Sequence, residues 1–157
     1  MSKVQTVSTT ASDPTVAAAA AQFLSPVVLG LQALTINGKQ AHWHVRGANF
    51  IGVHELLDTI VAHAGDFADT AAERIVALGL PIDARVSAVA AKAGETGVPA
   101  GFTQSDELVR AVIADIDAIL VDTKAAIDGL DEVDLTSQDV AIEIMRGLEK
   151  DRWFLVS

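Results

Sequence analysis

The chain has no cysteine, and its basic residues are few. Without cysteine, neither a disulfide nor a thiolate metal ligand can form. Only 11 lysines and arginines stand against 21 aspartates and glutamates, which gives a formal net charge of −10 and a pI near 4.6. Because affinity for nucleic acid depends on lysine and arginine displacing counterions from phosphates, this balance argues against DNA binding by the body of the protein.

Charge is also missing from one long apolar stretch, residues 14–38. Its polar side chains fall on one side of a helical projection: Gln22, Ser25, Gln32 and Thr35. The stretch is therefore amphipathic, and Pro26 interrupts it, which favours a buried bundle helix over a membrane span. As an export signal it would be unusual, with only Lys3 for a basic region and Asp13 in between. We expect a cytoplasmic protein that does not associate with a membrane.

The hydrophobic periodicity predicts one all-α domain. The chain has 157 residues, enough to bury a substantial core. Apolar residues recur at three- and four-residue spacing in four segments: about 25 (or earlier) to 44, 49–79, 105–130 and 137–154. Ser25 followed by Pro26 looks like the start of the first helix, and Asn49 looks like the N-cap of the second. Residues 1–14, rich in serine and threonine, should form a flexible tail ahead of a bundle at 15–157.

The connection between the second and third predicted helices is unusually long. Residues 80–104 contain a short possible helix at about 83–92 and a turn-rich segment after it. Such a connection exceeds what neighbouring antiparallel helices need, but it can span a bundle from end to end. The lengths favour a four-helix bundle with one long crossover over a simple up-down-up-down bundle.

The second predicted helix carries two polar pairs at i, i+4 spacing. His54 with Asp58 and Asp69 with Glu73 fall on one stripe of the helix, at about 100° per residue. Asp58 and Asp69 lie roughly 16 Å apart along the axis, too far for one small site in a single chain. Both pairings, 54 with 73 and 58 with 69, are centred on the same point, however. An antiparallel second copy would bring them together in two identical sites, as an isologous dimer requires.

Two further features fit this two-fold arrangement. At the crossing point the stripe carries Ala62 and Gly65, which are small enough for two helices to approach closely. His42 lies just before the turn that precedes the second helix and could fold back onto its first turns. Each site would then hold His42, His54 and Asp58 of one chain with the Asp–Glu pair of its partner. Imidazole and carboxylate ligands of this kind suit iron, zinc or manganese.

These residues resemble the Dps family of mini-ferritins, the DNA-binding proteins from starved cells. The family pattern is a histidine in an A-H-W context, a second histidine twelve residues on with aspartate at i+4, and Asp and Glu at i, i+4 after a further eleven. The chain meets it in full, with the flanking segments KQAHW and RGANF and a C-terminal RGLEKDRWF. The resemblance implies a ferritin-like bundle that assembles into a hollow shell of twelve subunits. It also implies Fe²⁺ oxidation at the dimer interface, preferably by hydrogen peroxide rather than oxygen, and storage of ferric mineral.

The resemblance assigns roles to four more residues. Trp43 would lie beside the oxidising centre, where it could intercept radicals, although a tryptophan at a helix end also packs against core or interface. Three acidic residues near the start of the last helix would line a three-fold iron entry channel: Asp134, Asp139 and Glu143. Favourable interaction with the helix dipole is the other interpretation of these three. His44 and His63 match no ligand position, and we expect them to be structural or surface residues.

Two other functions remain open from the sequence. A DNA-condensing protein is disfavoured by the acidic charge and by a predicted tail whose only basic residue is Lys3. Metal-dependent hydrolysis is a possible side activity, since an open metal position can activate water. The main prediction is a ferroxidase that binds iron, with zinc or manganese as possible occupants of the same site.

Overall fold

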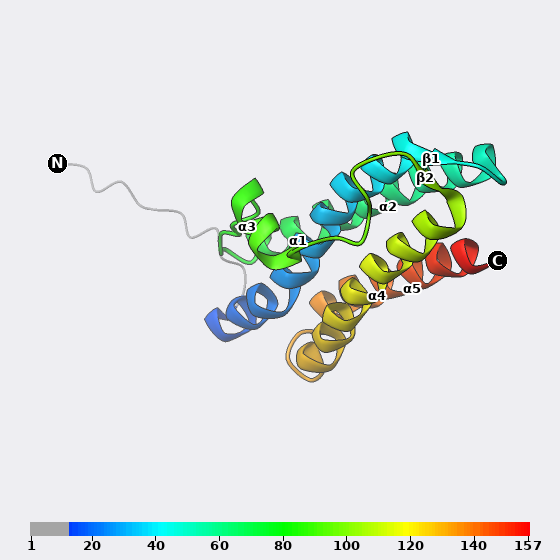
Figure 1. Cartoon of the computed structure of the whole chain (residues 1–157). Coiled ribbons are helices and arrows are strands. Elements are labelled where there is room, and N and C mark those ends of the chain that lie inside the picture. The colour runs from blue at the N-terminus through cyan, green and yellow to red at the C-terminus, as the bar shows by residue number, and fades with distance from the viewer. Residues whose placement is uncertain (1–12) are drawn as a thin grey trace.

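The computed structural model describes residues 13–157, which form four long helices, one short helix and two very short strands (Figure 1). Their bounds are α1 Pro14–His44, β1 Val45–Arg46, α2 Phe50–Ala77, α3 Val86–Ala93, β2 Thr103–Gln104, α4 Ser105–Leu130 and α5 Leu135–Val156. The predicted tail lies almost wholly outside the described residues. The all-α prediction is confirmed, and α4 has the predicted bounds.

Helix α1 begins at Pro14, well before the predicted start near Ser25. Asp13 caps it by accepting a hydrogen bond from the backbone N–H of Thr15 at 2.7 Å, and Pro14 takes the first turn. The same signal at Ser25 and Pro26 lies inside the helix, where the Ser25 hydroxyl donates to the carbonyl of Ala21. Pro26 has no N–H, so one carbonyl of the preceding turn lacks its helical hydrogen bond. That carbonyl lies on a side of the helix that water can reach, so α1 tolerates the proline.

Helix α1 is also long and apolar enough to cross a membrane by length and composition alone. In the described part of the chain it packs instead against α2, α4 and α3, and its leucines and valines lie in the bundle core. A core helix of a bundle passes the same length and composition test.

The crossover joins the two ends of the bundle. It includes α3, which begins three residues later than predicted, and ends where β2 pairs in parallel with β1, Val45 opposite Thr103. Figure 1 shows the chain leaving α3 at one end of the bundle and returning to the other end, where β1 and β2 meet. This pairing was not predicted from sequence. It ties the return of the crossover to the end of α1, directly after the residues that form the candidate site.

The core lies between α1, α2, α4 and α5. Its largest fully buried side chains include Leu31, Leu57, Ile116, Ile144 and Leu148. At two places an aromatic ring packs directly against a glycine of the neighbouring helix. The ring of Phe23 lies over Gly129 between α1 and α4, and the ring of Phe67 lies over Gly147 between α2 and α5.

Candidate metal site

His42 at the end of α1 and His54 in the first turns of α2 form a reciprocal pair. Nδ1 of His42 lies 2.7 Å from the carbonyl oxygen of His54, and Nδ1 of His54 lies 2.8 Å from the carbonyl oxygen of His42. The two rings stack with centroids 3.7 Å apart and planes 20° apart, and the ring of Phe50 stacks on His54 from 5.3 Å. The fold-back predicted for His42 is what the structure has.

These contacts fix the tautomer of both imidazoles. A carbonyl oxygen can only accept a hydrogen bond, so Nδ1 must carry the proton in each ring. In the neutral ring Nε2 then presents its lone pair. A backbone carbonyl on the opposite nitrogen is the usual arrangement of a metal-ligating histidine, because it orients the ring and raises the basicity of the ligand.

The third residue of the predicted set, Asp58, lies one turn along α2 and pairs with Lys39 of α1. The hydrogen bond from Lys39 lowers the pKa of the Asp58 carboxyl, with partial desolvation acting against it and the charge of Lys39 adding to it. The candidate ligand Asp58 is thus an anion that is already paired with a cation. Lys39 was not foreseen, although its i, i+3 spacing from His42 puts both on one face of the helix.

An open pocket of about 480 Å³ lies over these residues. It is lined by His42, His54, Glu55, Asp58, Thr59, Ala62 and His63. One chain supplies two imidazoles and one carboxylate here, and the pocket walls leave the site accessible from outside. With only three candidate ligands from one chain, a divalent cation bound here would keep open coordination positions.

Asp69 and Glu73 lie farther along α2, exposed and outside this pocket. Within residues 13–157 no group of three or more histidine, aspartate and glutamate side chains is close enough to enclose a metal ion. The chain alone therefore does not bring the five predicted ligands together. They divide into a histidine–aspartate half and an Asp–Glu half, as a site shared between two copies requires.

The comparisons with known proteins bear on this geometry. A ferritin-like domain model matches residues 30–157. The DNA protection during starvation protein of Agrobacterium fabrum is 35% identical over 123 residues, which cover 78% of this chain and 76% of that protein. A structure of Dps from Microbacterium arborescens in the high iron form shares 72% identity, with a TM-score of 0.91, and covers 94% of this chain and 95% of that one. The chain belongs to the Dps family. Mycobacterium smegmatis Dps has a similar structure, with 31% identity and a TM-score of 0.83 over 89% of this chain and 86% of that one.

Trp43 follows His42 in the sequence but does not line the pocket of the candidate site in this Dps chain. The residue is 63% exposed and lines a second pocket with Phe50, Phe102 and Arg46, whose guanidinium carbon lies 3.6 Å from the centre of the Phe102 ring. Because a tryptophan on an otherwise solvated surface favours burial, this patch suits contact with a further subunit.

The three acidic residues predicted for a Dps entry channel differ in their surroundings. Asp134 is the N-cap of α5: it accepts hydrogen bonds from the N–H and hydroxyl of Ser137 and pairs with Arg74 at 2.7 Å. Partial burial acts to raise its pKa, but the hydrogen bonds from Ser137 and Arg74 outweigh it and hold the pKa below the usual value. Asp139 and Glu143 are exposed. Asp134 thus has a capping role within one chain.

A histidine–aspartate pair was missed by sequence reasoning. Nδ1 of His63 lies 2.9 and 3.0 Å from the two carboxylate oxygens of Asp151 on α5. Burial raises the pKa of Asp151, and the hydrogen bond from His63 acts in the opposite direction. No motif signals this pair, because its members are far apart in the sequence and meet only through the α2–α5 contact.

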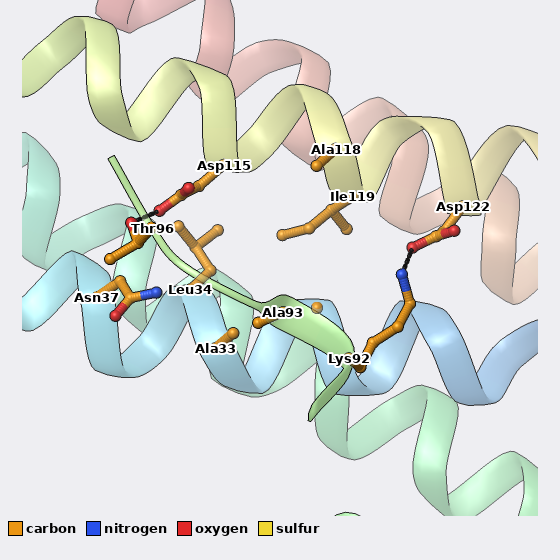
Figure 2. A pocket seen from close by; sticks show the side chains of 11 residues that line it. Ala33, Leu34, Asn37, Lys92, Ala93, Thr96, Asp115, Ala118, Ile119 and Asp122 are labelled. Carbon is orange, nitrogen blue, oxygen red and sulfur yellow. Dashed lines mark hydrogen bonds and ion pairs between the residues drawn. The ribbon is translucent and has the colours of Figure 1, made fainter. Parts of the chain in front are cut away.

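A small, mainly apolar cavity of about 80 Å³ lies between α1, α4 and the crossover (Figure 2). Figure 2 shows Thr96 pointing at Asp115 and Lys92 pointing at Asp122 across it. Both links tie the crossover to α4. The cavity contains no histidine, so we assign these polar contacts to holding the crossover in place.

Proposed function

We propose that this protein oxidises Fe²⁺ at a site shared by two subunits and stores the ferric product as a mineral. The observation that carries the proposal is the His42–His54 pair, whose Nδ1–H groups are bound to backbone carbonyls and whose Nε2 atoms are left for a metal. Membership of the Dps family supports a role in iron storage and protection in general, and the high-iron form of the Microbacterium protein supports iron as the cargo.

In this proposal each residue has a defined part. His42, His54 and Asp58 hold one subunit's share of the iron. Asp69 of the partner subunit and Glu73 of the partner subunit complete the site. Carboxylates bind Fe³⁺ more strongly than Fe²⁺, so the same ligands favour oxidation as well as binding. Hydrogen peroxide is the preferred oxidant, and its removal together with Fe²⁺ protects DNA without contact.

The shared site requires a two-fold dimer, and the larger assembly is proposed from the Dps family. Two-fold dimers build a hollow shell of twelve subunits in the cytoplasm, consistent with the Dps structures that this chain resembles. Asp139 and Glu143 would lie at the iron entry channel, with Asp134 fixing the start of their helix. Zn²⁺ or Mn²⁺ can occupy the iron site, since imidazole and carboxylate ligands suit all three metals.

Stopped-flow absorbance of ferric products tests the proposal. Protein loaded with Fe²⁺ without oxygen is mixed with peroxide or with oxygen. We expect fast oxidation of wild type, faster with peroxide, and a soluble product. An Asp58→Ala, Glu73→Ala double variant should lose this fast oxidation. Glu149→Ala, which removes an exposed carboxylate of α5, should keep it. A wild type that oxidises iron no faster than buffer would disprove the proposal.

The relatives' name, DNA protection during starvation, suggests direct DNA condensation as an alternative function. The formal charge of −10 on each chain opposes it. A gel-shift assay at low salt distinguishes the two modes of protection. We expect no retardation of duplex DNA, and retardation that disappears as salt rises would support condensation instead.

A further inference from the structure

The pair His63–Asp151 lies at the edge of the candidate iron site but belongs to no predicted ligand set. Asp151 is almost completely buried, with its side chain 3% exposed, whereas the His63 side chain is 44% exposed and lines the same pocket as His42, His54 and Asp58. One side of the imidazole thus faces a buried carboxylate, and the ring is otherwise open to the pocket.

The contact with Asp151 fixes the chemistry of His63. A carboxylate accepts, so Nδ1 of His63 donates the hydrogen bond and Nε2 of the neutral ring carries the lone pair. A buried carboxylate behind an imidazole fixes the tautomer and the orientation of the ring. The geometry is that of a positioned base.

His63 is also the imidazole of this pocket that the proposed ligand set leaves free. On the helical wheel His63 lies about 180° from His54 and about 140° from Asp58, so it points toward α5 and away from the predicted two-fold contact, and what it shares with the ligand set is the pocket. The charged or titratable groups around it are Asp151 of α5, His54, Glu55 and Asp58 of α2, and His42 of α1; Lys150 acts on Asp151. His42, His54 and Asp58 would be engaged by iron.

The proposed reaction releases protons. Two Fe²⁺, one H₂O₂ and two H₂O give two FeOOH and four H⁺: two electrons pass from iron to the peroxide O–O bond, and hydrolysis of the ferric ions liberates the protons. We propose that His63, positioned by Asp151, is the base that takes these protons from the iron site and passes them to solvent. The inference rests on the proposed function. Nε2 would take up a proton released when the iron is oxidised, the Nδ1–H bond to Asp151 would persist, and Nε2 would then release the proton to water in the pocket.

His63→Gln separates this role from a purely structural one. A glutamine amide can still donate to Asp151 but cannot take up a proton. Assembled wild type, His63→Gln and the control His44→Gln are compared; His44 binds the carbonyl of Gln40 through Nδ1 and does not line the pocket. The readouts are anaerobic Fe²⁺ binding, peroxide-driven oxidation across pH, and proton release followed with an indicator dye in weak buffer.

We expect His63→Gln to bind Fe²⁺ as wild type does, but to oxidise it and release protons about tenfold more slowly, which is below the usual general-base effect because water can substitute in part. Its pH profile should flatten, and concentrated buffer should restore the rate. If His63→Gln does not assemble, His63→Ala with added imidazole replaces it, and rescue by imidazole is expected.

Three results would overturn the inference: wild-type rates and pH profile in His63→Gln, loss of Fe²⁺ binding in that variant, which would make His63 a ligand, or no imidazole rescue of His63→Ala. Failure of the proposed function is separate, because it would appear as a wild type that does not oxidise iron at all.

Discussion

At the scale of single residues, backbone carbonyls fix the tautomer and orientation of the two proposed ligand histidines. Each ring of the His42–His54 pair donates to the main chain of the other residue. Substitution of one histidine therefore leaves a carbonyl without its donor and also frees the partner ring to rotate. The two imidazoles act as a unit, so single and double substitutions should weaken metal binding by similar amounts.

Lys39 provides a prediction about affinity. Its ammonium pairs with Asp58, which is a ligand in the proposed iron site, so the ammonium and a metal would compete for the same carboxylate. Lys39→Gln should tighten Zn²⁺ or Co²⁺ binding by about two- to fivefold, because an exposed ion pair is weak and its loss leaves the carboxylate free for the metal. Isothermal titration calorimetry of the assembled protein measures it. Lys124→Gln, which removes a similar pair with Asp128 on α4, should change nothing. Weaker binding in Lys39→Gln would mean that Lys39 orients Asp58 instead.

At the scale of helices, periodicity predicted the elements because each long helix buries one regular apolar face. Local signals were less decisive. Both Asp13–Pro14 and Ser25–Pro26 look like helix starts, and only the packing of the first turns against the bundle decides between them. Asn49 occupies the predicted N-cap position, but with φ 55° and no capping hydrogen bond from its side chain. The ligand spacing was readable because it lies on one helix. The Lys39–Asp58 and His63–Asp151 contacts join separate helices and have no signature in sequence.

Helix packing against glycine makes a second prediction. A Cβ at Gly147 would lie 2.2 Å from the ring of Phe67, so α5 and α2 approach closely only without one. Gly147→Ala should cost about 1–3 kcal/mol of stability through overpacking. Denaturant unfolding monitored by circular dichroism measures it. Gly101→Ala places the new methyl in open space and is the matched control. Equal stability of the two variants would show that the Phe67 ring moves aside freely.

The contact between Asp115 of α4 and Thr96 of the crossover gives a prediction about how stability depends on pH. Burial raises the pKa of Asp115, with the hydrogen bond from Thr96 acting against it. A carboxyl with a raised pKa in the folded state destabilises the fold once it ionises, so this penalty is present at neutral pH and disappears as pH falls. Asp115→Asn keeps an acceptor for Thr96 and should melt about 2 °C higher than wild type at neutral pH, with the difference shrinking in acid. Glu149→Gln is the control. A variant that melts lower at neutral pH would show that the charge itself is needed.

At the scale of the whole molecule, one chain brings together only part of the proposed iron site. Within the described residues it gathers two imidazoles and one carboxylate, while Asp69 and Glu73 stay exposed elsewhere on α2. Because two-fold symmetry duplicates every contact, a single crossing of α2 helices at Ala62 and Gly65 would complete two sites at once. The acidic charge that opposes DNA binding would, on the inner surface of a shell, provide sites for ferric mineral.

Complementation tests this division of the site between chains. Asp58→Ala and Glu73→Ala each damage every site of a uniform dimer. A mixed dimer, however, has one site in which both defects meet and one site that is intact, because the two halves of each site come from different chains. Co-assembly of equal amounts of both chains should therefore restore about a quarter of wild-type peroxide-driven iron oxidation, since half of randomly formed dimers are mixed and each regains one of its two sites. The measurement is the rate per chain, with separately assembled variants combined just before the assay as the control. A site built within one chain would give no restoration on co-assembly.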